Sequence, residues 1–115
     1  MKKNFLLIFI FYLSLIVSSY GAASSGGSSS SSYDKGASLI KKAKKLESKG
    51  KIEKANKRYE KAFKYLLKSN EKNPNQADTL NYLGFALRKL GNFEEAEKYY
   101  LQGLNIKPDH HGINE

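Results

Sequence analysis

Few side chains in this sequence are of types that take part in catalysis or metal binding, and their spacing suits neither. His110 and His111 are adjacent, and neighbouring residues at a helix start point in different directions, so they rarely bind one metal. Glu94 and Glu95 fall in the first turn of an expected helix, where the helix dipole favours negative charge. No cysteine is present, which excludes thiolate nucleophiles and cysteine-based zinc sites. We therefore expect a non-enzymatic protein without metal or cofactor, with both histidines in a solvated turn.

The first 23 residues have the composition of a secretory signal peptide. Two lysines follow the initial methionine, residues 5–17 are uncharged and mainly apolar, and small residues come next. A membrane-spanning helix needs about 20 apolar residues, so we expect cleavage, after Gly21 or Ala23; retention as an anchor is the alternative. The protein would then be exported, and its Lys- and Asn-rich composition favours a bacterial periplasm.

Residues 24–34 are expected to form a flexible tether. Ser24 to Ser32 are only serine and glycine, which bury no apolar surface. These serines have no histidine or acid placed to activate them, and the chain has no phosphate-binding loop, HExxH helix or nucleophile elbow. About 80 residues remain for a folded core, a size at which stability is expected to be marginal.

Apolar periodicity in the rest of the chain predicts an all-α fold with four helices. Apolar residues recur every three or four positions in four stretches, as in amphipathic helices. Gly50 and Gly91 suit the left-handed residue past a helix end, while Pro74 and Pro108 close the second and fourth helices. Two asparagines, at positions 75 and 92, are each followed three residues later by an acid, which is capping-box spacing.

The two halves of the helical region repeat each other. Gly50 matches Gly91 at an offset of 41 residues, whereas Pro74 matches Pro108 at an offset of 34. Both offsets hold if the second helix of the first half carries seven extra residues. Seven residues are nearly two helical turns, so they lengthen the helix without turning its apolar face away from the core.

Residues 77–110 resemble a tetratricopeptide repeat of 34 residues, and the run from Gly91 to Ala96 matches the family's turn into its second helix. Residues 35–76 depart from the pattern, because Ala43 replaces the family's glycine, and they resemble a degenerate, elongated repeat. The residues of the second repeat at the family's structural positions are Leu80, Leu83, Gly84, Leu87, Ala96, Tyr100, Gly103 and Pro108.

This resemblance implies an α-solenoid of helical hairpins with about two repeats. Gly84 and Ala96 would lie where the helices approach most closely, so their side chains must be small. Residues 111–115 would start a further helix or a truncated end, and no polar capping helix follows. We expect either part of a longer array or an open C-terminal face covered by another subunit in an oligomer.

The resemblance also implies a scaffold that binds a peptide or partner protein in a concave groove. In the family, positions 2, 5, 9 and 12 of each first helix line that groove. An aromatic ring beside an amide and a guanidinium can bury area and hold a peptide's carbonyls or carboxylate; the alternative for Phe85 is packing against the first repeat. The corresponding residues are Asp78, Asn81, Phe85 and Arg88, with Ala37, Ile40, Lys44 and Glu47 in the degenerate repeat.

Positive charge is concentrated in the first hairpin. Residues 34–72 hold fourteen Lys/Arg against five Asp/Glu, and residues 73–115 hold four against six. A solvated face is one explanation; the alternative is a tethered oligomerisation or anionic-surface-binding module, with acidic lipid, polymer or protein as partner. A nucleic-acid partner is not expected, because export would separate the protein from nucleic acid. The lysines are also not interleaved with aromatic residues that could stack on bases. The basic residues of the second helix are Lys54, Lys57, Arg58, Lys61, Lys64, Lys68 and Lys72.

Overall fold

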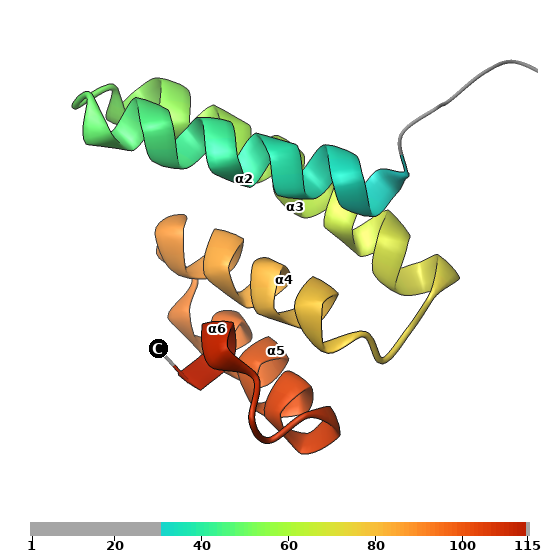
Figure 1. Cartoon of the computed structure of the whole chain (residues 1–115). Helices are drawn as coiled ribbons and strands as arrows, with labels where there is room; N and C mark the ends of the chain where they lie inside the picture. Colours follow the sequence, from blue (N-terminus) through green and yellow to red (C-terminus); the bar gives the residue numbers. More distant parts are fainter. Residues whose placement is uncertain (1–30, 115) are drawn as a thin grey trace, which may run out of the picture.

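The computed structural model describes residues 31–114, and helices account for most of them (Figure 1). The expected signal peptide and most of the expected tether lie outside the described residues. Among residues 31–114 there is no strand, and no helix is long and apolar enough to cross a membrane. The helices are α2 (Ser32–Ser48), α3 (Ile52–Lys72), α4 (Ala77–Lys89), α5 (Phe93–Ile106) and α6 (His111–Asn114).

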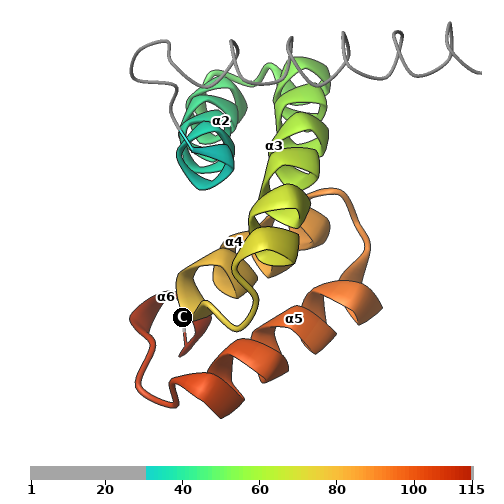
Figure 2. The ribbon, with the colours of Figure 1, turned by 90° about the vertical axis from the view of Figure 1, so that its right-hand side faces the viewer.

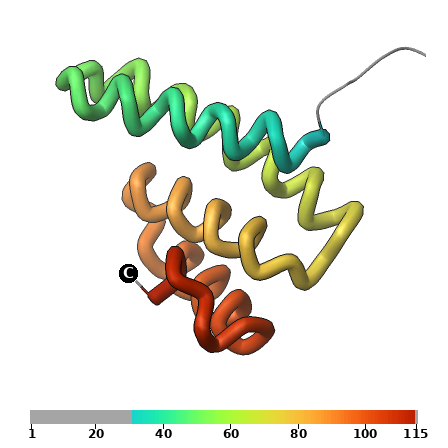
Figure 3. The backbone as a smooth tube through the Cα atoms, in the orientation of Figure 1, coloured from blue at the N-terminus to red at the C-terminus, as the bar shows by residue number. Residues whose placement is uncertain are grey.

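The helices form two hairpins, which confirms the predicted all-α helical-hairpin fold. Helix α2 packs along α3, and α4 packs along α5; the hairpins meet mainly through α3 and α4, with α2 also touching α4. Figure 2 shows the second hairpin stacked beside the first, and the backbone trace in Figure 3 shows the repeated up-and-down path. The short α6 lies against α4 and α5.

Both hairpins turn through the same glycine-centred helix end. Gly50 and Gly91 have φ angles of 76° and 85°, the left-handed region predicted for them. In the first turn, the Lys51 N–H donates to the Leu46 carbonyl at 2.9 Å and the Gly50 N–H donates to the Glu47 carbonyl, also at 2.9 Å. In the second turn, the Gly91 N–H donates to the Arg88 carbonyl at 3.1 Å and the Asn92 N–H donates to the Leu87 carbonyl at 2.8 Å. This shared pattern is the Schellman motif.

The helix starts differ from the prediction. Asn92 is the N-cap of α5 but makes no side-chain capping bond, and Asn75 precedes the N-cap of α4 with a φ of 65°, so neither predicted capping box forms. The capping bond instead lies at Ser31, whose Oγ accepts from the Asp34 N–H at 3.1 Å and donates to Asp34 Oδ2 at 2.8 Å. Helix α2 therefore begins at Ser32, and the tether predicted to extend to residue 34 ends earlier.

Each hairpin has one glycine packed under a large side chain. A Cβ at Gly84 would lie 2.7 Å from Tyr100 Cε1, so the predicted close contact of α4 with α5 is present. The equivalent contact in the first hairpin involves Gly36, where a Cβ would lie 2.6 Å from Leu66 Cγ. The core between the helices consists of Leu39, Ile40, Ala43, Ala55, Tyr59, Ala62, Leu66, Leu80, Leu83 and Ala86.

Candidate functional site

Two adjoining hollows lie on the face that α2 and α4 form, and we call them together the groove. The larger hollow, of about 530 Å³, lies along α2, and the smaller, of about 200 Å³, lies along α4 and reaches α5 and α6. Lys44 and Tyr82 border both hollows, so the two adjoin at these side chains. The other lining residues are Ala37, Ser38, Ile40 and Lys41 of the larger hollow, and Asn81, Phe85, Arg88, Tyr100, Gly112 and Ile113 of the smaller.

The structure places most of the residues predicted to line a groove on this surface. Asn81, Phe85 and Arg88 of α4 meet Lys44 of α2 in the smaller hollow. Ile40 borders the larger hollow but is only 2% exposed, so it forms the floor of the groove and belongs to the core. The spacing of three and four residues on each helix explains why these side chains share one face.

Phe85 lies at the centre of the smaller hollow and is half-buried. Its ring packs edge-on against Tyr59 of the core, with 6.0 Å between ring centroids. Three cations surround the same ring: Lys44 Nζ at 4.6 Å, the Arg88 guanidinium carbon at 5.3 Å and Lys89 Nζ at 5.5 Å from the centroid. Phe85 therefore packs against the first repeat and also lines the groove.

Glu47, at the last groove position of the degenerate repeat, does not line either hollow. Its Oε2 accepts from the Tyr59 hydroxyl at 2.7 Å, and its Oε1 accepts from Lys89 Nζ at 2.7 Å. The hydrogen bond from Lys89 has the largest effect and that from Tyr59 the next largest. Together they hold the pKa of the Glu47 carboxyl below its ordinary value. The carboxylate is thus satisfied within the protein. The charge facing the groove is the positive charge of Lys41, Lys44 and Arg88.

Asp78 also lies away from both hollows, because it binds the C-terminal segment. His110 Nε2 donates to Asp78 Oδ1 at 2.6 Å, and His110 Nδ1 accepts from the Ile113 N–H at 3.3 Å. These two bonds hold the His110 ring between Asp78 of α4 and the backbone of α6. His110 is buried, so the expectation of a solvated turn is wrong for this residue and holds only for His111, which is exposed.

Helix α6 covers the C-terminal end of the groove. The Ile113 side chain fills the space above Gly103 of α5. A Cβ at Gly112 would lie 2.5 Å from Asn81 Nδ2, so α6 approaches the Asn81 amide closely. Sequence reasoning missed this contact, although it gave the start of a further helix as one expectation for residues 111–115.

Most residues at the family's structural positions in the second repeat lie in the interior. Leu80 and Leu83 are fully buried, Leu87 and Ala96 nearly so, and Gly103 is buried under α6. Pro108 follows the last residues of α5. Within the described part of the chain, no three His, Asp or Glu side chains gather where they could hold a metal ion. The described site thus offers positive charge, an amide and an aromatic ring.

Comparison with known proteins places this architecture in a family. No curated protein and no solved structure matches the sequence. A family model described as "Tetratricopeptide repeat" matches residues 34–109, which cover both hairpins. Such repeats generally mediate protein–protein interactions and are typically non-catalytic. The chain therefore belongs to the tetratricopeptide-repeat family.

Proposed function

We propose that this protein is a non-enzymatic scaffold that holds an extended peptide segment of a partner protein in the groove. The observation that carries the proposal is the gathering of Lys44, Asn81 and Arg88 around the half-buried ring of Phe85. Fixed cations beside an apolar surface are the combination that interface hot spots use. The groove is also bounded by rigid helices, which lowers the entropy lost on binding.

The chemistry of these side chains indicates the ligand. A carboxylate, from an acidic side chain or a chain end, would accept hydrogen bonds from Lys44 and Arg88. An apolar or aromatic side chain next to it would stack on Phe85. The Asn81 amide can donate to one peptide carbonyl and accept from one peptide N–H. The ligand would therefore carry an apolar residue beside a carboxylate.

The test begins with selection of peptides from a displayed random library on the full chain. Binding of the selected peptides is then measured by fluorescence anisotropy. The double variant Asn81→Ala/Arg88→Ala should weaken binding at least about tenfold, as loss of hot-spot contacts does, with nearly unchanged melting. A matched control is Lys98→Ala/Lys107→Ala, two exposed residues outside the groove. If Asn81→Ala/Arg88→Ala binds the peptides normally and Phe85→Ala unfolds the protein, the groove is not the binding site.

We further propose that the scaffold works in the cell envelope after export. The support is the pattern of residues 1–23: a positive start, a short apolar stretch and small residues. Mass spectrometry of protein from a secretion-competent bacterial host should find a new N-terminus at residue 22 or 24. Recovery of the chain with Met1 in the membrane fraction would show retention as an anchor instead.

A further inference from the structure

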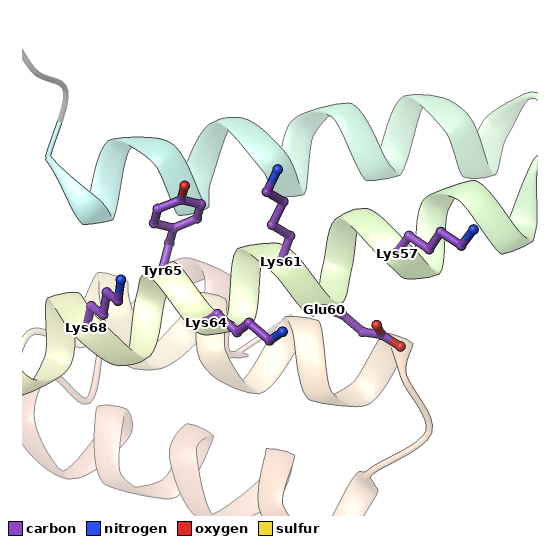
Figure 4. Close-up of a pocket in the computed structure, with 6 residues that line it drawn as sticks. All are labelled: Lys57, Glu60, Lys61, Lys64, Tyr65 and Lys68. Carbon is purple, nitrogen blue, oxygen red and sulfur yellow. The ribbon is translucent and has the colours of Figure 1, made fainter.

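The first hairpin carries a second surface, separate from the groove, on helix α3. Lys57, Lys61, Lys64 and Lys68, which we call the lysine row, border a hollow of about 420 Å³ together with Glu60 and Tyr65 (Figure 4). All four lysines are exposed. They recur at spacings of three and four residues, so they follow one side of the helix. None of them lines the groove.

The basic surface continues from α3 onto α2. A second hollow, of about 470 Å³, shares Lys61 and Tyr65 with the first. Its other basic residues are Lys35 and Lys42 of α2 and Arg58 of α3, and Asp34 is its acidic residue. Seven cationic side chains therefore surround two joined hollows that contain two carboxylates.

The charges of the lysine row are not neutralised within the described part of the chain. Among residues 31–114, the ion pair between a lysine or arginine and a carboxylate is Lys89–Glu47, and it does not involve the row. Lys57 and Lys61, and likewise Lys64 and Lys68, are four residues apart on one helix, a spacing at which like charges repel. An anion bound along the row would relieve this repulsion and neutralise several charges at once.

Tyr65 and its surroundings narrow the class of anion. The ammonium groups of Lys35 and Lys68 lie 5.6 and 6.0 Å from the Tyr65 ring centroid. Because the ring contacts these two lysines, it offers little surface for a nucleic-acid base to stack on. A membrane-binding surface presents apolar side chains that insert between lipids. Within residues 31–114, the exposed large hydrophobics are Ile52, Phe93, Leu101 and Ile106, and none borders these hollows.

We propose that the lysine row binds an extended acidic segment of a partner protein. The row spans eleven residue steps, or about 16 Å at the helical rise of about 1.5 Å per residue. An extended chain covers that length with about five residues at about 3.3 Å each. Carboxylates at alternate residues of such a segment would lie about 6.6 Å apart on one side. Successive lysines are about 4.5–6 Å apart along α3, which flexible side chains readily match.

The experiment measures binding of the full chain to a fluorescein-labelled peptide of four Glu-Ser repeats. Substituting the row with glutamine (Lys57→Gln, Lys61→Gln, Lys64→Gln and Lys68→Gln) should weaken binding at least about tenfold, because four close charge contacts are lost. The control removes the same charge at four exposed lysines elsewhere: Lys49→Gln, Lys51→Gln, Lys98→Gln and Lys107→Gln. It should change affinity less than about threefold, since distant charges are screened by salt. A Gln-Ser peptide should not bind.

Three outcomes would overturn this assignment. Equal weakening by the two sets of substitutions would mean that only net charge matters. Phosphatidylglycerol vesicles or single-stranded DNA are compared with the acidic peptide at equal concentration of negative charge. If either binds more tightly than the peptide, and that binding is lost with the row, the surface would be a lipid-binding or nucleic-acid-binding site. The groove variant Asn81→Ala/Arg88→Ala should bind the acidic peptide normally, so failure of the groove proposal leaves this one intact. Loss of acidic-peptide binding in that variant would move the peptide to the groove.

Discussion

Glu47 of α2 and Lys89 of α4 form an ion pair with 2.7 Å between Oε1 and Nζ, which ties the first helices of the two repeats together. The other oxygen of Glu47 accepts from the hydroxyl of Tyr59, a core residue of α3. One carboxylate thus joins three helices at the edge of the core. It also fixes Lys89 beside Phe85, the aromatic residue of the groove.

Substituting Glu47→Gln should lower the free energy of unfolding by about 0.5–1.5 kcal/mol at pH 7, because a partly exposed ion pair is lost and a hydrogen bond weakened. The pKa of the folded Glu47 carboxyl lies below its ordinary value of 4.5, so its stabilisation is present above about pH 4.5. It disappears as pH falls through the lowered pKa. Urea unfolding at pH 7 and at pH 3 should therefore show a smaller difference between variant and wild type at pH 3.

The glycine under Tyr100 gives a prediction about the hairpin contact. Gly84→Ala places a Cβ within 2.7 Å of the Tyr100 ring, and Gly84→Leu requires much more space. Overpacking costs about 1–3 kcal/mol or more, out of a total of about 3–5 kcal/mol for a domain of this size. Thermal unfolding followed by circular dichroism should show a large loss for Gly84→Ala and an unfolded chain for Gly84→Leu.

A second substitution serves as the control for that contact. Tyr100→Leu leaves more room above position 84, so Gly84→Ala should cost less in the Tyr100→Leu background than alone. Additive effects of the two substitutions would mean that Gly84→Ala destabilises through some other contact. Unchanged melting of Gly84→Leu would contradict the close packing of α4 on α5.

Features set by local interactions were predictable from the sequence. Gly50 and Gly91 end helices because a left-handed residue costs little only for glycine. The apolar periodicity gave the helices, and family positions placed Asn81, Phe85 and Arg88 on one face of α4. That face follows from helix geometry alone, so it needed no knowledge of the partner helix.

Features that depend on distant residues were not predictable in this way. The His110–Asp78 bond joins residues 32 positions apart, and no local pattern marks the two as partners. Gly36 packs under Leu66, a residue of the other helix of the hairpin that lies far from it in the sequence. The cap at Ser31 was overlooked for a different reason: its serine stands inside a tract whose composition indicates a flexible linker. An acid three residues later, Asp34, was the available signal.

Buried tyrosines predict loss of stability at alkaline pH. Burial, followed by the hydrogen bond to Glu47, raises the pKa of Tyr59 above its ordinary value of 10.0, and burial also raises the pKa values of Tyr33, Tyr99 and Tyr100. A raised pKa means that the unfolded chain releases these protons first. The contribution of these tyrosines to stability should therefore be constant below about pH 9 and be lost as pH rises past 10.

The Tyr59→Phe variant checks this prediction. It should be less stable than wild type at pH 8, because the bond to Glu47 is lost, but its stability should fall less steeply between pH 10 and pH 11.5. Guanidinium unfolding across that range measures both effects. A decline as steep as in wild type would mean that Tyr59 does not contribute to the alkaline transition.

Helix α6 should depend on His110 for its position over the groove. His110→Ala removes the bonds to Asp78 and to the Ile113 N–H, each worth about 0.5–1.5 kcal/mol. Because α6 has only four residues, it has little helical stability of its own. Hydrogen exchange should show faster exchange at Ile113 and Asn114, with little change in the melting of α2 to α5.

The matched control is His111→Ala, which replaces the exposed histidine next to His110 and should leave exchange unchanged. Unchanged exchange in His110→Ala would mean that the packing of Ile113 on Gly103 holds α6 without His110.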